Sequence, residues 1–187
     1  MHKQILILFT AVSFLLLPGC AQKLPVSGGQ AGGIMAFPMK AELNSGKEFT
    51  CYYAIAGKVP QPFEIKIYPM AGRDFIISDI LTPGTYEIDT WITYATPTTG
   101  VSTSFNKKED NLQEPVYITV KDGEITMASE RLEIVRSSSV QESFSQSFEW
   151  IRLNKAEVQT YKNKLKSLEN GGLWQIHIES DKPKITT

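Results

Sequence analysis

Side chains that could perform chemistry are few in this chain of 187 residues, which contains two histidines and two cysteines. His2 lies in the short stretch ahead of an apolar N-terminal run, within a segment that is typical of a signal peptide, so His177 is the histidine left to the rest of the chain. In the stretch LWQIHIE, His177 shares a strand face with Gln175 and Glu179, and we expect it to face solvent. One histidine excludes multi-histidine metal sites, and no G-x-S-x-G motif is present. The residue types therefore predict a non-enzymatic protein without a metal or cofactor.

Glu87 and Asp89 form a candidate ligand-binding site, because strand alternation puts both acids on one face together with Trp91. Two nearby carboxylates can hydrolyse a glycosidic bond, and an aromatic ring can stack on a sugar. Three interpretations stay open: a glycan hydrolase, a carbohydrate-binding surface around Trp91, and an exposed strand without a ligand. A cleft enclosing both acids would favour the hydrolase. A coplanar strip of exposed rings would favour carbohydrate binding.

Residues 1–19 have the composition of an export signal. Lys3 precedes an apolar run over residues 5–17, shorter than the roughly 20 residues that a membrane-spanning helix needs. The run ends in Leu17-Pro18-Gly19-Cys20, which resembles the lipobox of bacterial lipoproteins. That resemblance implies cleavage before Cys20, a lipid (palmitate among its acyl chains) on this residue, and membrane attachment. The alternative is an ordinary secretory signal, although no A-x-A-like cleavage site follows the run.

The same resemblance implies a location in the cell envelope. Ala21 follows Cys20, whereas the resembling family uses Asp at this position for retention at the inner membrane. The outer membrane, with the domain facing the periplasm, is therefore favoured if there are two membranes. The chain has 19 Lys and Arg against 20 Asp and Glu. This balance gives no electrostatic basis for binding nucleic acid.

The rest of the chain predicts one β-rich domain behind a tether. Residues 20–33 comprise the lipidated Cys20 and a Gly-rich stretch without hydrophobic period, which predicts a flexible tether outside the core. From residue 34 to 187 we expect a single domain. Apolar residues there alternate at period 2, which is typical of half-buried strands. Pro38 indicates that the first strand lies at a sheet edge.

Pro83-Gly84 predicts a type II turn, because Pro presets φ at its second position and Gly supplies a positive φ at its third. It lies in Leu81-Thr82-Pro83-Gly84-Thr85-Tyr86, between two strand-like stretches. This run resembles the signature of transthyretin-like β-sandwiches, such as carboxypeptidase regulatory-like modules. The resemblance implies an antiparallel β-sandwich (transthyretin-like or Ig-like). It covers too few residues to imply a function.

Two further stretches have contrasting local signals. Residues 95–115 are polar and lack periodicity, which predicts a long loop that is either disordered and solvated or a binding loop. Asp122-Gly123 predicts a type I′ hairpin, in which Val120 opposes Ile125 and Ile118 opposes Met127.

Near the C-terminus, the pattern predicts a helix over about residues 155–170. Asn154 and Glu157 form a capping box at its start. Apolar residues recur at helical spacing, which predicts that the helix docks on the sandwich: Val158, Tyr161, Leu165 and Leu168. A helix lying on a membrane surface is the alternative.

The sequence thus predicts a mainly β fold, an antiparallel β-sandwich with one C-terminal helix. For function, it favours a lipid-anchored envelope protein that acts as a structural or interaction module. This module would bind an envelope protein or glycan through its sheet edges or the 95–115 loop. A carbohydrate-binding module and a glycan hydrolase remain the alternatives.

Overall fold

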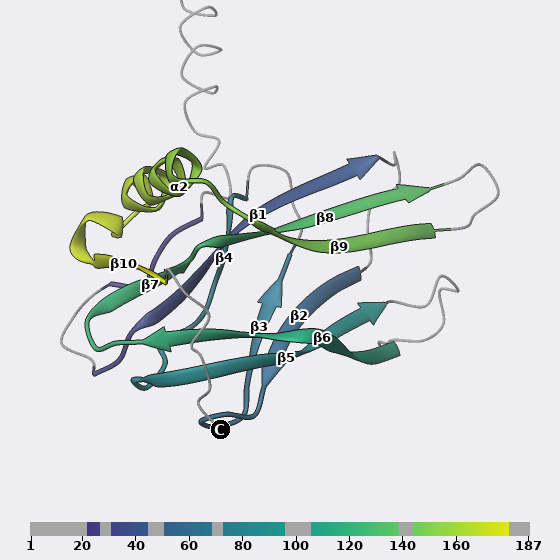
Figure 1. Ribbon diagram of the computed structural model, residues 1–187, viewed down its shortest axis with the longest axis horizontal. Helices are drawn as coiled ribbons and strands as arrows, with labels where there is room; N and C mark the ends of the chain where they lie inside the picture. The colour runs from purple at the N-terminus through teal and green to yellow at the C-terminus, as the bar shows by residue number, and fades with distance from the viewer. Residues whose placement is uncertain are drawn as a thin grey trace, which may run out of the picture.

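The computed structural model describes residues 22–26, 31–44, 51–68, 73–95, 106–138 and 144–179. Most of them form two sheets that pack in two layers (Figure 1). The larger sheet contains β1 (Ile34–Asn44), β4 (Phe75–Ile77), β7 (Glu124–Ala128), β8 (Glu130–Ser138), β9 (Phe144–Arg152) and β10 (Gln175–Glu179). The smaller sheet contains β2 (Cys51–Gly57), β3 (Phe63–Ile67), β5 (Gly84–Ala95) and β6 (Asn106–Val120). The predicted mainly β, two-layered fold is confirmed.

The larger sheet is mixed, whereas the sequence predicted an antiparallel sandwich. β7 and β8 follow one another with only Ser129 between them, and both run parallel to β1. β10 runs parallel to β7, while β4 and β9 pair antiparallel with β1 and β8. The smaller sheet, in the order β3-β2-β5-β6, is antiparallel. Alternation of apolar residues reports which face of a strand is buried, and it does not report the direction of the neighbouring strand.

β1 lies inside the larger sheet, so the edge position predicted from Pro38 is wrong. Residues 34–36 pair with β7 and residues 39–44 pair with β8. Pro38 lies in the interval between these two registers. A residue without an N–H is tolerated there, because neither β7 nor β8 needs a ladder hydrogen bond from it.

The inter-sheet core lies between the two layers. Alternate residues of β1 reach it, and they meet inward-facing residues of β2, β3 and β5. Its largest fully buried members are Phe37, Tyr53, Tyr86, Met35, Met39, Ile55, Ile67, Ile88 and Ile118. Aromatic rings connect the layers directly, since Phe148 of β9 makes an edge contact with Tyr53 of β2, with their centroids 5.3 Å apart.

A second core, the helix cluster, lies where α2 (Lys155–Ser167) packs against the larger sheet. Ile34 and Ala36, the residues of β1 that point away from the inter-sheet core, belong to it together with the fully buried Leu165. Val158, Tyr161 and Leu168 also pack there. The predicted docking of the helix is therefore confirmed. The 3-10 helix η2 (Gly171–Leu173) follows α2 and leads into β10.

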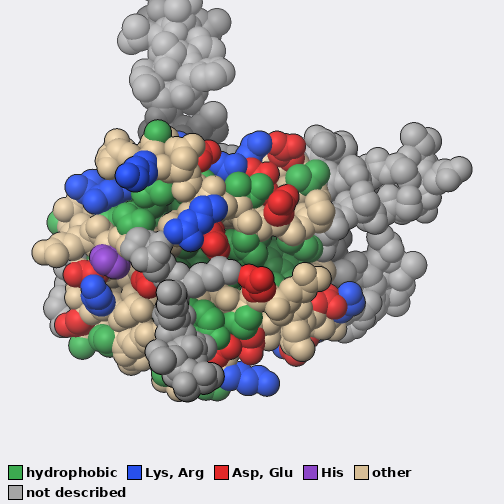
Figure 2. All heavy atoms as spheres, viewed as in Figure 1, with side chains coloured by type: hydrophobic (Ala, Val, Ile, Leu, Met, Phe, Trp, Pro, Cys, Tyr) green, Lys and Arg blue, Asp and Glu red, His purple; other side chains and the backbone are tan. Residues whose placement is uncertain are grey.

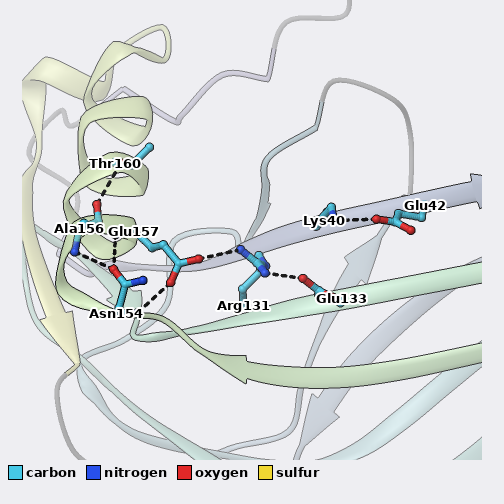
Figure 3. A network of polar contacts seen from close by, with 8 residues as sticks. All are labelled: Lys40, Glu42, Arg131, Glu133, Asn154, Ala156, Glu157 and Thr160. Atoms are coloured by element: carbon cyan, nitrogen blue, oxygen red, sulfur yellow. Dashed lines mark hydrogen bonds and ion pairs between the residues drawn. The ribbon is translucent and has the colours of Figure 1, made fainter.

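The start of α2 is fixed by the predicted capping box (Figure 3). The Asn154 side chain accepts hydrogen bonds from the N–H groups of Ala156 and Glu157, at 2.9 and 3.0 Å. The Glu157 carboxylate accepts from the Asn154 N–H at 2.9 Å. Glu157 also lies 3.5 Å from Arg131 of β8, which forms a second ion pair with Glu133. The cap thus connects the helix start to the sheet beneath it.

Residues 22–26, which we call the strap, pack against the domain instead of forming part of a flexible tether. Leu24 is 1% exposed and belongs to the helix cluster. Its N–H donates to the Glu169 carbonyl (3.1 Å), and its carbonyl accepts from the Asn170 side chain (2.9 Å). Trp174 donates its indole N–H to the Pro25 carbonyl at 2.9 Å. The tether prediction is wrong here because one buried Leu, without any period, holds the segment.

The turn at Asp122-Gly123 connects the two sheets instead of closing a hairpin. β6 pairs with β5, and β7 pairs with β1 and β10; the described strands contain no ladder between β6 and β7. Gly123 has a positive φ of 70°, but Asp122 does not, so the predicted type I′ turn is wrong. Val120 consequently faces the inter-sheet core, whereas Ile125 belongs to the helix cluster.

Pro83-Gly84 makes a similar connection, from β4 in the larger sheet to β5 in the smaller one. Gly84 has a φ of 158°, far from the roughly +80° of a type II turn, so that prediction is also wrong. Tyr86 closes this bend, because its hydroxyl donates to the Thr82 carbonyl at 2.9 Å.

The latter part of the predicted loop 95–115 is strand. Residues 106–111 of β6 pair with residues 90–95 of β5, while residues 96–105 lie outside the described ranges. Lys107 pairs with Glu109 (2.5 Å) and Lys108 with Asp110 (3.0 Å), so both faces of this edge strand carry charges. That arrangement removes the apolar alternation by which a strand is recognised.

Candidate functional site

An irregularity in β5 decides where Trp91 points. The register with β6 shifts between Ile88, opposite Val116, and Thr90, opposite Asn111, so residues 112–115 of β6 form an irregular stretch in the ladder. Tyr86, Ile88 and Trp91 therefore share the inner face despite the odd spacing. Trp91 is 5% exposed. The prediction that Trp91 shares an outer face with Glu87 and Asp89 is wrong, because it assumed unbroken alternation.

Glu87 and Asp89 are both half-buried, and each has a local partner. The Glu87 carboxylate accepts a hydrogen bond from the Tyr117 hydroxyl at 3.1 Å, and Asp89 accepts one from the Thr90 hydroxyl at 2.7 Å. Burial raises the pKa of the Tyr117 hydroxyl, and the bond to Glu87 adds to this rise. Neither acid lines the main cleft described next.

That cleft, of about 740 Å³, opens between the two layers where β6 and β9 run along their margins. Figure 2 shows hydrophobic side chains at the surface between the layers on this side of the molecule. Its apolar lining comes from both sheets: Trp91, Leu112, Val116, Phe148 and Trp150. Residues 112–115, the irregular stretch of β6, all line it. We refer to it as the β6–β9 cleft.

The cleft exists because the smaller sheet extends further than the larger one. Phe148 of β9 contacts Trp91 of β5, with 4.0 Å between the ring centroids. The last strand of the larger sheet thus lies opposite β5, the third strand of the smaller sheet. Residues 112–116 of β6, one strand further out, have no described strand of the larger sheet opposite them, whereas Ile118 and Val120 near the end of β6 are buried in the inter-sheet core. The apolar side chains of residues 112–116 consequently stay half-buried.

The charged side chains around the cleft are predominantly acidic: Asp110, Glu114, Glu130 and Glu179 against Lys108 and Arg152. Lys108 is paired with Asp110 at 3.0 Å. The side chain of Glu179, the last residue of β10, accepts from the Thr119 N–H at 3.4 Å. An apolar floor with an acidic rim suits a ligand that has apolar groups and a positive charge.

The outer face of the smaller sheet carries three tyrosines that do not form a platform for a sugar. Tyr52 stacks on Tyr94 at 4.4 Å with planes 12° apart, and on Tyr68 at 5.6 Å with planes 27° apart. The rings cover each other's faces, whereas a sugar-binding strip presents its ring faces to solvent. Burial raises the pKa of the Tyr94 hydroxyl, and its hydrogen bonds to Glu64 (3.0 and 2.9 Å) add to the rise.

The remaining sequence candidates lie apart from the cleft. His177 is half-buried in β10 and pairs with Thr126 of β7. No group of three or more His, Cys, Asp or Glu side chains capable of holding a metal occurs among the residues that the structure describes. Cys20 and the apolar segment before it lie outside the described ranges. No helix within those ranges is long and apolar enough to cross a membrane.

The sequence analysis did not identify Leu112, Phe148 or Trp150 as residues of a candidate site. A signal for the cleft does exist in β9. Phe148 and Trp150 are two residues apart, with polar Ser147 and Glu149 beside them, in a strand that pairs on one side. The extent of each sheet, which leaves this face uncovered, is not encoded in any local pattern.

Comparison with known proteins found no matching family model, no matching curated protein and no matching solved structure.

Proposed function

We propose that this chain is a lipid-anchored protein of the bacterial cell envelope whose β-sandwich is a non-enzymatic binding module. The partner-binding site is the β6–β9 cleft. One observation carries the assignment of this site: at this margin the smaller sheet extends one strand beyond the larger one, and leaves a cleft of about 740 Å³ with apolar side chains from both sheets that the described residues do not fill. Soluble domains rarely leave such surfaces open unless something binds there.

The anchor is supported by the leader sequence. An apolar run over residues 5–17 ends in Leu17-Pro18-Gly19-Cys20, the pattern that resembles a lipobox. Several acyl chains on one residue hold a protein on a membrane stably, since each buried CH₂ contributes about 0.8 kcal/mol. Ala21 after Cys20 favours the outer membrane, with the module facing the periplasm.

The non-enzymatic assignment is supported by the positions of the acids. Glu87 and Asp89 lie outside the cleft and are engaged by Tyr117 and Thr90. The positions of the aromatic rings argue against the carbohydrate-binding alternative. Trp91 has its ring against Phe148 and Tyr53, and the outer tyrosines stack face to face.

A photo-crosslinking residue in place of Leu112 tests the site in intact cells, with the same residue in place of exposed Lys66 on β3 as the matched control. We expect a discrete cross-linked envelope partner from position 112 and none from position 66. Equal products from both positions, or none from position 112, would contradict the proposed site.

The anchor is tested separately. Cys20→Ala should move the protein out of the detergent phase and the membrane fraction, or leave it uncleaved. If wild-type protein partitions into the aqueous phase with an unmodified Cys20, the lipoprotein assignment is wrong.

A further inference from the structure

Both strands that border the cleft are sheet edges. β9 pairs only with β8, and β6 only with β5, in the part of the chain that the structure describes. In an edge strand, every second residue directs its backbone N–H and C=O groups to the outer side of the sheet. There, these groups can form ladder hydrogen bonds with an additional strand. Figure 1 shows β9 in the upper layer and β6 in the lower one, on the same side of the molecule.

The two edges differ in how well they resist pairing. The first part of β6 carries Lys107, Lys108, Glu109 and Asp110, and residues 112–115 interrupt its ladder register. Charges and irregular backbone of this kind are what proteins use to prevent strand addition. β9, with the sequence FSQSFEWIR, has only Glu149 and Arg152 as charged residues and pairs with β8 in an unbroken register. β9 is therefore the receptive edge.

A strand added to β9 would also cover the cleft. Neighbouring strands lie about 4.8 Å apart and packed sheets about 10 Å apart. Because β9 lies opposite β5, the next strand position beyond β9 lies opposite β6. Alternate side chains of the added strand would point inward, toward Leu112, Val116 and Trp150. The larger sheet would then extend as far as the smaller one.

We propose that the partner binds by β-strand addition: an extended peptide segment pairs with the edge of β9 and inserts alternate apolar side chains into the cleft. Its flanking residues are basic, because acids outnumber bases around the rim. This inference rests on the proposed function and specifies the partner of the same site. Backbone pairing supplies affinity in this mode of recognition, and the pockets for alternate side chains supply specificity.

The test uses the mature lipidated protein in detergent micelles and the synthetic peptide KVTVKVTVK. Controls are a peptide of the same composition with its valines grouped, and two versions that are N-methylated at alternate residues. In an extended strand, alternate N–H groups point to the same edge. Each N-methylated version therefore blocks one edge and leaves the side chains unchanged.

We expect the alternating peptide to change tryptophan fluorescence and to slow amide hydrogen exchange in β9 at least tenfold, but not in β3. One N-methylated version should lose at least tenfold in affinity, while the other binds like the parent. The grouped peptide should bind at least tenfold more weakly. Equal binding by both N-methylated versions, or unchanged exchange in β9, would overturn strand addition.

Variants keep the test independent of folding. Trp150→Ala removes part of the cleft, but it also removes a contact with Phe37 of the core, at 5.7 Å between centroids. Loss of peptide binding in this variant could therefore reflect a change in folding. Glu130→Gln changes only the rim, and should weaken peptide binding several-fold and reduce its salt dependence. Lys66→Ala is the control and should bind like wild type. If Glu130→Gln binds with wild-type affinity and salt dependence, the basic character of the partner is wrong.

The outcomes separate this inference from the proposed function. If position 112 cross-links a partner while both N-methylated peptides bind equally, the site stands and strand addition is wrong. If the peptide pairs with β9 but no envelope partner cross-links, strand addition stands and the cellular role is wrong.

Discussion

Two apolar surfaces of this domain differ in whether another segment of the chain covers them. On the larger sheet, the surface around β1 and β7 is covered by α2 and the strap, and Leu24 and Leu165 there are at most 1% exposed. At the margin between the sheets, Phe148 and Trp150 are only half-buried, and no described segment lies over residues 112–116 of β6. The chain thus supplies a cover for one surface and leaves the other open. The first surface belongs to the stability of the fold, and we propose that the second serves recognition.

Of the substitutions that test this difference, Leu165→Asp should lower stability the most, because it places a charge in the covered surface. Leu165 is fully buried in the helix cluster. An unpaired buried charge together with the lost apolar contacts should lower the free energy of unfolding by about 4 kcal/mol or detach α2. Thermal unfolding measures it, with exposed Lys166→Asp as the neighbouring control. Unchanged melting would mean that the helix does not hold the sheet.

Leu24→Ala tests whether the strap is structural. Truncating a buried Leu to Ala costs about 2–5 kcal/mol, and we expect the lower end since the strap is a single short segment. Val26→Ala, at a side chain that is 63% exposed, should change stability by no more than about 0.5 kcal/mol. If both variants melt alike, the strap is not part of the covered surface.

Trp150→Ala tests the open surface. Since Trp150 is half-buried, its truncation should cost less than the roughly 3–5 kcal/mol of a fully buried aromatic residue. We expect about 1–2 kcal/mol in chemical denaturation, together with a loss of partner cross-linking at position 112. A cost as large as that of Leu165→Asp would place Trp150 in the structural core instead.

The smallest expected effect is a change in the pH dependence of stability caused by Tyr94. This residue belongs to neither of the two surfaces, so its substitution serves as a reference for both. Burial raises the pKa of Tyr94 in the folded state, and its bonds to Glu64 add to this. The unfolded state then loses its proton first, so stability is fully present below about pH 10 and falls as pH rises toward the folded pKa. Tyr94→Phe should flatten this alkaline decline, as measured by denaturation between pH 8 and 11. Cleft binding at neutral pH should not change.

The sequence predicted the local structure of some single elements correctly, but not which strands the turns connect. The capping box at Asn154, the stripe through Leu165 and the positive φ at Gly123 follow from short-range rules, and all three are present. The connections were wrong at Asp122-Gly123 and Pro83-Gly84. A turn that joins two sheets and a turn that closes a hairpin use the same residue types.

The candidate site was harder to predict than the fold. Trp91 was assigned to the wrong face because the register shift beside Thr90 leaves no signal in the residues around it. The cleft depends on β6 extending beyond β9, a property of two whole sheets. The lipid anchor at Cys20 is a prediction from the leader alone.

If Cys20 carries the proposed lipid, the docked strap also limits how far the domain can move from a bilayer. Its first described residue, Gln22, donates a hydrogen bond to the Phe75 carbonyl at 2.6 Å. Two peptide units separate it from Cys20, a span of at most about 8 Å. With a lipid on Cys20, the domain would stay against the lipid headgroups, and its rotation relative to the membrane would be restricted. A partner in solution could not be reached by extension of the chain, and would have to approach the membrane surface itself.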